Sequence, residues 1–449
     1  MNVVISESPV DLRIAVTVDG ALRRYYALNK GDLNPGVIAV GLVTKVLPGL
    51  KSAFVKIGSE QQVFVPFDRG SDSLKAGQTV LVSVYRKAEA GKEPMARLGV
   101  TLRGIQAIVL PGNGVRHSKG LRVDGSVREW SDLCEQQGME VLLRTSSSWS
   151  SLQQVAKECA FLKQQVDSWS LEMARSGEPR ILSDGLVAYV LDVIARASRS
   201  EPARVVCDDS HLAHKLRDYL VACAPQIASQ CSFHRGPTMA FDALKITSQI
   251  DAFQKPKVWL KSGGFLLFHD ANGITTIDVN SGKSSQRLKN RLTLNLEAAA
   301  ESARQIQLRD IGGLIVMDFL DLSSDGDRAQ VERCFRAGMA DDSSKWRMEP
   351  LNGLGVGVMS REKTGGPAAV RCPKCKGSGS LIAVDEQARA MARTLWQQSK
   401  TSSAGSFLLE VSKPIRRHLD QHPDMLTWAA HLKLTWSLGH DTWQVTPDD

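Results

Sequence analysis

The stretch from residue 263 to residue 318 constrains the fold more than any other part of the chain. Two β-rich runs lie at 265–269 and 274–280, with a turn signal between them at 270–273. An apolar stripe at helical spacing follows at 292–306, and a final apolar run lies at 314–317. Patterns of this kind predict a hairpin, an amphipathic helix and a buried strand. We therefore expect a sheet with a helix packed on one of its faces.

Three polar side chains stand at the ends of the predicted strands. Asp278 and Asn280 are two positions apart, which places both on one face of a strand, and Asp318 ends the next apolar run. Carboxylate and amide oxygens without His or Cys suit a hard cation such as Mg²⁺, which can activate water and stabilise charge on a phosphoryl group. Alternatively, Asp318 is a helix cap or loop residue and Asn280 a turn residue.

Three motifs give this stretch a family resemblance. The segments TTIDVNSGK, NLEAAAESARQIQLRDIGGLIVMDF and RCPKCKGSG, in this order, resemble the catalytic core of the ribonuclease E/G family. The resemblance implies a catalytic Mg²⁺ held by Asp278 and Asp318, with Asn280 assisting. It also implies cleavage of single-stranded RNA that leaves a 5′-phosphate and a 3′-hydroxyl. It extends over nearly the whole chain and indicates a short, ribonuclease G-like member.

Length, charge and cysteine content limit the class of protein. A chain of 449 residues is too long for one core, so we expect roughly two to four domains. The net charge of +8 permits nucleic acid or another anionic partner without choosing between them. No run approaches the about 18 apolar residues that span a membrane, and the N-terminus lacks a signal-peptide pattern. The scattered cysteines form no disulfide framework, so we expect a cytoplasmic protein.

Residues 35–100 have the pattern of a small β-barrel. Short β-rich runs alternate with Gly and Pro, and the strands of an OB-fold can be placed on them. Phe54 and Phe64 lie among Lys and Arg residues, and aromatic rings on a basic β-surface can stack RNA bases. The other interpretation is that both rings belong to the barrel core. The family resemblance implies an S1-type domain in which Phe54, Phe64 and Lys92 contact RNA.

A serine cluster in residues 101–180 follows a predicted strand and precedes a long amphipathic helix. Serines before a helix cap its free N–H groups, and that helix end favours anions. Arg144 beside it could bind a phosphate bidentately. An ordinary cap next to a surface Arg would give the same pattern. The resemblance implies a 5′-monophosphate sensor formed by Arg144 and Thr145 and completed by Gly104 and Ile108.

Cys372 and Cys375 form the one CxxC motif of the sequence. They could be a redox dithiol, a turn without metal, or half of a zinc site shared between two chains. The Gly-Ser-Gly run just after the motif argues against a redox helix start. The family resemblance implies the shared zinc site: a Zn²⁺ link between the protomers of a homodimer, with dimers able to pair into a homotetramer.

The family resemblance implies a multidomain α/β (α+β) fold. Its expected parts are an RNase H-like subdomain, an inserted OB-fold (S1-type) barrel, a 5′-sensor region, a DNase I-like catalytic subdomain, a zinc link and a small C-terminal α+β domain. The RNase H-like subdomain is expected at residues 1–34 and 181–253, the barrel at 35–100 and the 5′-sensor region at 101–180. The catalytic subdomain is expected at 254–368, the zinc link at 369–380 and the C-terminal domain at 381–449.

The chain departs from the family pattern at two places. The loop after Asn280 is shortened and altered, and Val358 stands where members typically carry Glu before Met-Ser/Thr-Arg. We expect a magnesium-dependent endoribonuclease that acts on single-stranded RNA in RNA processing or decay. A catalytically weak or inactive RNA-binding homologue is the alternative. A metal-dependent phosphatase or DNA nuclease is a further alternative, which activity on DNA or small phosphate esters would favour.

Overall fold

The computed structural model divides into two compact units. The first comprises residues 1–269 and 275–368, and the second residues 270–274 and 369–449. The structure describes residues 1–58, 61–66, 74–88, 93–122, 129, 132, 139–253, 255–271, 273–282, 291–322, 324–342, 344–362, 383–401, 404–439 and 443–448. No helix within these ranges is long and apolar enough to cross a membrane.

The N-terminal strands form a sheet with segments more than two hundred residues further along the chain. Its strands are β1 (Asn2–Glu7), β2 (Asp11–Val18), β3 (Ala21–Asn29), β14 (Arg204–Cys207) and β15 (Cys231–Phe233). The order in the described residues is β15-β14-β1-β2-β3, with β1 parallel to β14 and antiparallel to β2. The N-terminal segment is too short to bury a core alone. Its pairing with β14, which in turn pairs with β15, supplies the later strands that it needs.

Helices cover both faces of this N-terminal sheet. They are α3 (Leu186–Ala197), α4 (Ser210–Cys223), α5 (Pro225–Ala228), α6 (Ala240–Ala243) and α7 (Ile246–Phe253). One face packs its apolar side chains against α3, α4 and α5, and the other packs against α6 and α7. Cover on both faces explains why β1 is buried over four consecutive residues.

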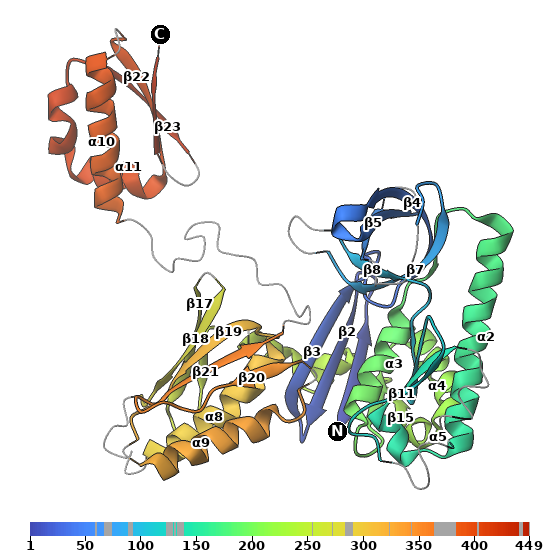
Figure 1. Ribbon diagram of the computed structural model, residues 1–449. Helices are drawn as coiled ribbons and strands as arrows, with labels where there is room; N and C mark the ends of the chain where they lie inside the picture. The colour runs from blue at the N-terminus through green and yellow to red at the C-terminus, as the bar shows by residue number, and fades with distance from the viewer. Residues whose placement is uncertain are drawn as a thin grey trace. The chain divides into compact units, whose positions relative to one another are not determined.

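Residues 38–98 form a closed barrel, drawn in blue in Figure 1. Its strands, with one 3₁₀ turn, are β4 (Ile38–Leu47), η1 (Pro48–Leu50), β5 (Ser52–Ile57), β6 (Gln61–Pro66), β7 (Thr79–Arg86) and β8 (Met95–Leu98). The order β4-β5-β6-β8-β7 closes through pairing of β7 with β4, as the predicted OB-fold requires. A later strand, β13 (Arg180–Ser183), adds to β4.

A small sheet and a long helix follow the barrel. They consist of β9 (Leu102–Arg103), β10 (Ala107–Leu110), β11 (Gly114–His117), β12 (Glu140–Leu143), η2 (Thr145–Trp149) and α2 (Leu152–Ser176). Ser151 caps α2 in a capping box: its side chain accepts from the Gln154 N–H, and the Gln154 side chain accepts from the Ser151 N–H. One serine therefore caps this helix as the sequence predicts, whereas the serines at 146–148 lie in η2.

The sheet built from residues 257–361 contains the stretch that constrains the fold most. Its elements are β16 (Lys257–Trp259), β17 (Phe265–Ala271), β18 (Ile274–Asn280), α8 (Arg291–Leu308), β19 (Gly313–Asp318), α9 (Asp325–Met339), β20 (Trp346–Met348) and β21 (Val356–Arg361). The strand order in the described residues is β16-β17-β18-β19-β21-β20. Figure 1 shows α8 and α9 together on one side of this sheet. The two paired strands, the helix and the final strand are confirmed. β19 is buried on one face only, because Ile315 and Met317 are enclosed whereas Leu314 is 41% exposed.

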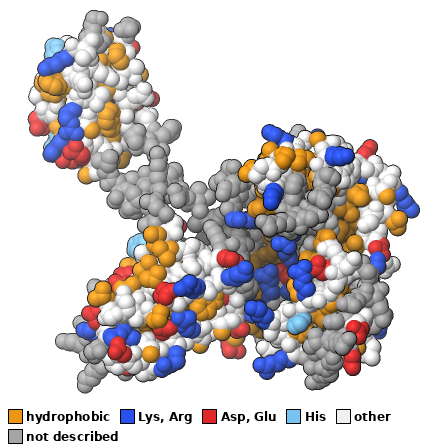
Figure 2. Space-filling view, in the orientation of Figure 1, with side chains coloured by type: hydrophobic (Ala, Val, Ile, Leu, Met, Phe, Trp, Pro, Cys, Tyr) orange, Lys and Arg blue, Asp and Glu red, His pale blue; other side chains and the backbone are white. Residues whose placement is uncertain are grey.

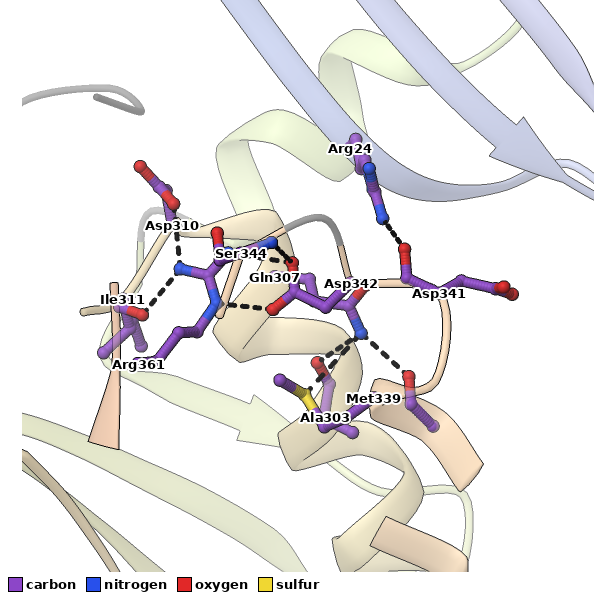
Figure 3. A network of polar contacts seen from close by, with 11 residues as sticks. Arg24, Ala303, Gln307, Asp310, Ile311, Met339, Asp341, Asp342, Ser344 and Arg361 are labelled. Carbon is purple, nitrogen blue, oxygen red and sulfur yellow. Dashed lines mark hydrogen bonds and ion pairs between the residues drawn. The ribbon is translucent and has the colours of Figure 1, made fainter. Parts of the chain in front are cut away.

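Contacts join the N-terminal sheet to the helices α8 and α9. Arg304 of α8 donates to the Leu22 carbonyl of β3 at 2.6 Å, and Arg24 of β3 donates to the Asp341 carbonyl (Figure 3). A cavity of about 410 Å³ lies at this junction. Five arginines are among the residues that line it: Arg23, Arg24, Arg196, Arg199 and Arg304.

The second unit has its own core. Its described elements are α10 (Val384–Thr401), β22 (Ser406–Val411), α11 (Lys413–Gln421), η3 (Pro423–Ala429), β23 (Lys433–Leu438) and β24 (Trp443–Pro447). The strands pair in the order β23-β22-β24, and Trp428, Trp436 and Trp443 pack at the margin of the core. The expected α+β composition of this segment is thus present.

Candidate functional site

The β16–β21 sheet has one face packed on helices and one face that we call the open face. Ile277 and Val279 of β18 and Ile315 and Met317 of β19 are buried in a core with α8 and α9. Side chains alternate along a strand, so their neighbours in sequence point the other way. Asp278, Asn280 and Asp318 therefore all lie on the open face.

β18 and β19 are neighbouring strands, so the polar side chains that the sequence singled out come from adjacent strands of one sheet. Asn280 donates from Nδ2 to Oδ2 of Asp278 at 2.6 Å, which confirms that these two side chains share a face. Asp278 is partly buried and Asp318 is exposed. The buried side chains of β18 and β19 point to the opposite face, which α8 and α9 cover.

The donor set fits a hard cation better than a soft one. Within the described residues, no group of three or more His, Cys, Asp or Glu side chains is arranged to hold a metal ion. The set on the open face is smaller, with two carboxylates and one amide. Mg²⁺ keeps several of its waters and is often bound through one or two carboxylates, so a sparse oxygen set suits it.

Asn295 holds the chain where it leaves β19. This side chain is fully buried in α8; its Nδ2 donates to the Leu320 carbonyl at 2.7 Å, and its Oδ1 accepts from the Leu320 N–H at 3.1 Å. The paired bonds fix the backbone two residues after Asp318. Sequence reasoning treated this part of the helix as an apolar stripe and missed Asn295; the signal was a polar residue beside buried positions of the helical period.

A close backbone approach fixes the other end of the site. An added Cβ at Gly264 would lie 2.8 Å from the Asn280 carbonyl O and 2.7 Å from a Leu294 methyl. No side chain fits there, so only glycine lets the start of β17 lie against the end of β18. Glu297 of α8 accepts hydrogen bonds from the Lys261 and Ser262 N–H groups in the preceding turn.

The strand on the far side of β19 places Val358 on the open face as well. β19 and β21 are antiparallel, with Val316 opposite Val358 and Asp318 opposite Val356. Gly357 and Met359, which flank Val358, are buried on the helix side. The site is therefore bordered by an aliphatic side chain next to the strand that carries Asp318.

Phe54 and Phe64 lie on the outside of the barrel. They are opposite each other on β5 and β6, and their ring centroids are 5.6 Å apart in an edge-to-face arrangement. Their neighbours in the strands, among them Val55 and Val63, form the barrel core, whereas both phenylalanines are only partly buried. Lys45, opposite Phe54, is exposed. The interpretation of both rings as core residues is wrong, because the strand alternation turns them outward.

Arg144 is a buried residue with buried partners. Its exposed fraction is 8%, and Nη1 lies 2.8 Å from Oδ1 of Asp192 and 3.1 Å from the Gly104 carbonyl. Burial lowers the pKa of Arg144, and Asp192 opposes that shift. Burial alone would raise the pKa of Asp192, but Arg196 and Arg144 hold it below its usual range. The interpretation of Arg144 as a surface residue beside a cap is wrong.

The other residues of the predicted sensor lie around Arg144. Thr145 begins η2 and is partly buried, and Ile108 of β10 is opposite Leu142, two residues before Arg144. Gly104 accepts the hydrogen bond described above. The structure thus brings all four predicted residues into one region, with the guanidinium already ion-paired.

Glu158 fixes the loop that carries Gly104. Its buried carboxylate accepts from the N–H groups of residues 105, 106 and 107 at 2.8, 2.7 and 2.9 Å, and from the Tyr219 hydroxyl at 2.7 Å. Burial raises the pKa of Glu158, and these hydrogen bonds oppose the shift. A Cβ at Gly104 would lie 2.7 Å from the Glu158 carboxyl carbon, so this position needs glycine. Sequence reasoning missed Glu158, which looks like an exposed position of an amphipathic helix.

Comparison with known proteins now adds the family. Residues 101–364, more than half of the chain, match the family described as "Ribonuclease E/G family". The chain belongs to the ribonuclease E/G family. It is 26% identical to ribonuclease E of Haemophilus influenzae over 393 residues, which cover 80% of the chain and 41% of that protein. It is 25% identical to ribonuclease G of Escherichia coli over 457 residues, which cover 93% of the chain and 92% of that protein.

A cyanobacterial relative gives a similar result. The chain is 29% identical to ribonuclease E of Nostoc sp. over 376 residues, covering 77% of the chain and 54% of the relative. The chain thus spans about half the length of the ribonuclease E relatives. Val358 lies on the same face as the candidate metal ligands, and its departure from the ribonuclease E/G pattern stays a prediction.

Three of the predicted site residues of this ribonuclease E/G family member lie outside the described residues. They are Lys92 in the barrel segment and Cys372 and Cys375 in the CxxC motif. Their predicted roles in RNA contact and in a zinc link therefore stay predictions.

Proposed function

We propose that this protein is a magnesium-dependent endoribonuclease that cleaves single-stranded RNA in RNA processing or decay and leaves a 5′-phosphate and a 3′-hydroxyl. The observation that carries the proposal is the open face, on which two neighbouring strands carry two carboxylates and an amide. Membership of the ribonuclease E/G family and similarity to proteins named ribonuclease E and ribonuclease G support the same reaction class.

Asp278 and Asp318 would hold the cation, and Asn280 would fix the carboxylate beside it. Bound Mg²⁺ supplies a Lewis acid for a phosphoryl oxygen and lowers the pKa of a water. The Nδ2 group of Asn280 binds one oxygen of Asp278 and so orients its carboxylate. The amide oxygen of Asn280 stays available as a neutral ligand. Asn295 positions the backbone after Asp318 and keeps the two carboxylates on their adjacent strands.

The barrel would hold the RNA through its outward aromatic pair. Phe54 and Phe64 present adjacent, partly buried rings, with Lys56 exposed on β5 and Lys45 exposed on the neighbouring β4. Rings of this kind stack bases of any sequence while cations neutralise the backbone. Lys92 is proposed as a third contact on the family resemblance alone.

The finer architecture is proposed on the same basis. In the order β15-β14-β1-β2-β3, the pairs β1–β2 and β2–β3 are antiparallel and the pairs β1–β14 and β14–β15 are parallel, which is compatible with an RNase H-like subdomain. The β16–β21 sheet with α8 and α9 would be the DNase I-like catalytic subdomain. Cys372 and Cys375 would bind Zn²⁺ with a second chain and form a homodimer, which could pair into a homotetramer.

Recognition of a 5′-monophosphate by Arg144, Thr145, Gly104 and Ile108 is a weaker part of the proposal. Arg144 is ion-paired with Asp192, so a phosphate would have to compete with that carboxylate. Selectivity for 5′-phosphorylated over 5′-hydroxyl RNA would support the sensor.

The test is cleavage of a 5′-labelled single-stranded RNA with Mg²⁺, with EDTA, and with two variants. Asp318→Asn should abolish cleavage, whereas Asp321→Asn, an exposed Asp three residues downstream, should leave it unchanged. Mapping of the product ends would show the expected 5′-phosphate. RNA binding without cleavage would favour the inactive homologue. Equal activity on DNA or on small phosphate esters would favour the second alternative.

A further inference from the structure

Two aromatic side chains and a lysine form a cluster at the edge of the β16–β21 sheet. Trp259 is 64% exposed, and its ring centroid lies 5.3 Å from that of Phe265 at an interplanar angle of 64°. The ammonium of Lys257 lies 3.8 Å from the Trp259 centroid and 3.7 Å from the Phe265 centroid. The cation thus contacts both rings, and most of the Trp259 surface stays accessible to solvent.

The cluster lies on the open face. Val258, between Lys257 and Trp259, packs against the core shared with α8 and α9, and so does Leu266, which follows Phe265. Alternation along the strands therefore turns the two rings and the ammonium to the face that carries the candidate metal ligands. In Figure 2, hydrophobic side chains gather over the region of β17 and β18.

The cluster also lies at the end of the sheet where β18 ends. Trp259 is opposite Phe265 in the register of β16 and β17. Gly264, just before Phe265, approaches the Asn280 carbonyl so closely that no side chain fits between them. β16, β17 and β18 are consecutive in the sheet. At strand spacings of about 4.8 Å, Trp259 is about 10 Å across the sheet from the strand of Asp278 and Asn280.

A structural role does not account for this arrangement. Neither ring belongs to the buried core of the sheet, and a solvent-exposed tryptophan contributes little apolar burial. A single exposed apolar residue would need no explanation. Here two rings and a cation are grouped beside an acidic, oxygen-rich centre, which is the combination that binds single-stranded nucleic acid: rings for bases and a cation for the backbone.

We propose that Trp259 and Phe265, with Lys257, form a base-stacking subsite for a nucleotide adjacent to the one that is cleaved. The subsite takes a nucleobase of any sequence on the exposed Trp259 ring, and Lys257 neutralises a neighbouring phosphate. The proposal rests on the proposed function for the position of the cleaved bond. It does not require turnover, because stacking and charge neutralisation occur in the bound state.

The first experiment measures binding of a labelled single-stranded RNA by fluorescence anisotropy in EDTA, where cleavage is absent. Trp259→Ala should weaken binding by roughly five- to 150-fold, the loss expected for one stacked base. Trp259→Phe should retain most of the affinity. Trp396→Ala is the matched control, because Trp396 is 50% exposed and has Lys400 3.7 Å from its ring in the second unit. Equal effects of Trp259→Ala and Trp396→Ala, or none, would overturn the subsite.

The second experiment locates the stacked base. RNAs with a single abasic nucleotide at successive positions around the cleavage site should show one position where wild type loses affinity and Trp259→Ala does not. Additive losses at every position would contradict the proposal. Lys257→Gln should lower the slope of log K against log salt by about 0.7, as expected for one phosphate contact on a single strand.

The two proposals can fail separately. If no RNA is cut but Trp259→Ala still weakens RNA binding, the subsite holds and the nuclease proposal fails. If RNA is cut with unchanged KM and unchanged affinity in Trp259→Ala, the nuclease holds and the subsite fails. Thermal unfolding of each variant separates these outcomes from loss of fold.

Discussion

The open face and the surroundings of Arg144 are two polar sites that use their charges in opposite ways. On the open face, Asp318 is exposed and Asp278 has one neutral partner, Asn280. Around Arg144, the guanidinium and the Asp192 carboxylate are almost fully buried and paired with each other. The first site leaves negative charge facing solvent, whereas the second compensates its charges internally.

The difference shows what each site can contribute. A carboxylate that faces solvent can take a cation without breaking an existing bond. A buried ion pair must be broken before either member binds a ligand, and that leaves a charge without compensation. We therefore expect substitutions on the open face to change chemistry with little change in stability. Substitutions around Arg144 should change stability first.

The largest expected effect is on catalysis. Asp278→Asn should lower the rate of RNA cleavage by about a thousandfold, because a metal ligand contributes several kcal/mol to the transition state. The melting temperature should stay within about 1 °C of wild type, because Asp278 is outside the core. Single-turnover cleavage with saturating Mg²⁺ and a thermal melt measure the two quantities. A large drop in melting temperature would remove the contrast between the sites.

The second effect is on stability at the buried pair. Asp192→Ala leaves Arg144 and Arg196 without their shared carboxylate and should lower the free energy of unfolding by about 3–5 kcal/mol. Asp218→Ala, at a 66% exposed side chain, is the control and should stay within about 0.5 kcal/mol. Urea denaturation measures both. Similar small changes in the two variants would show that the pair is dispensable.

The third effect is on RNA affinity at the barrel. Phe54→Ala and Phe64→Ala should each weaken binding of single-stranded RNA by about 1–3 kcal/mol, since each removes a stacking surface. Phe233→Ala, at a 38% exposed ring of β15, is the control and should leave binding unchanged. Anisotropy titrations in EDTA measure the affinity. Unchanged binding in both barrel variants would remove the barrel from the RNA path.

The smallest effect is on pH dependence. The pKa of Asp192 is held below its usual range, so its ionised form is favoured in the folded state. Its contribution to stability is complete above about pH 4, the ordinary Asp pKa, and is lost as the pH falls below it. Wild type should therefore lose stability below pH 4 more steeply than Asp192→Asn, by up to about 1.4 kcal/mol per pH unit. Chemical denaturation of both proteins from pH 3 to pH 6 measures the free energy of unfolding. Equal losses of stability in wild type and Asp192→Asn as the pH falls would show that the inference is wrong.

The predicted elements around residues 265–318 agree closely with the structure because local pattern decides them. Alternation in β18 and the helical period of α8 depend on neighbouring residues, which the sequence displays directly. The buried face of α8 also includes Asn295, Ser302 and Gln305. These polar residues could not be assigned to the core from the sequence. Asn295 bonds to the chain after β19 and Gln305 bonds to neighbouring turns, whereas the buried Ser302 hydroxyl has no hydrogen-bond partner among the described residues.

The sequence could not decide between opposite interpretations of the aromatic pair and of Arg144. A β-strand shows that Phe54 and Val55 point in opposite directions, but it does not show which direction is the interior. That choice depends on how the barrel closes through β4 and β7. The burial of Arg144 depends on Asp192, which is 48 residues away and belongs to α3.

By itself the sequence determined that Asp278 and Asn280 share a face, that a helix separates them from Asp318, and that a serine caps a long helix. These features follow from the side-chain periodicity of a strand or a helix, which backbone geometry sets. Only the tertiary structure decided that Asp318 joins that face and that Trp259 lies at its edge. It also decided that Arg144 is enclosed with a carboxylate. Such proximity depends on packing between segments distant in sequence, and no local pattern encodes it.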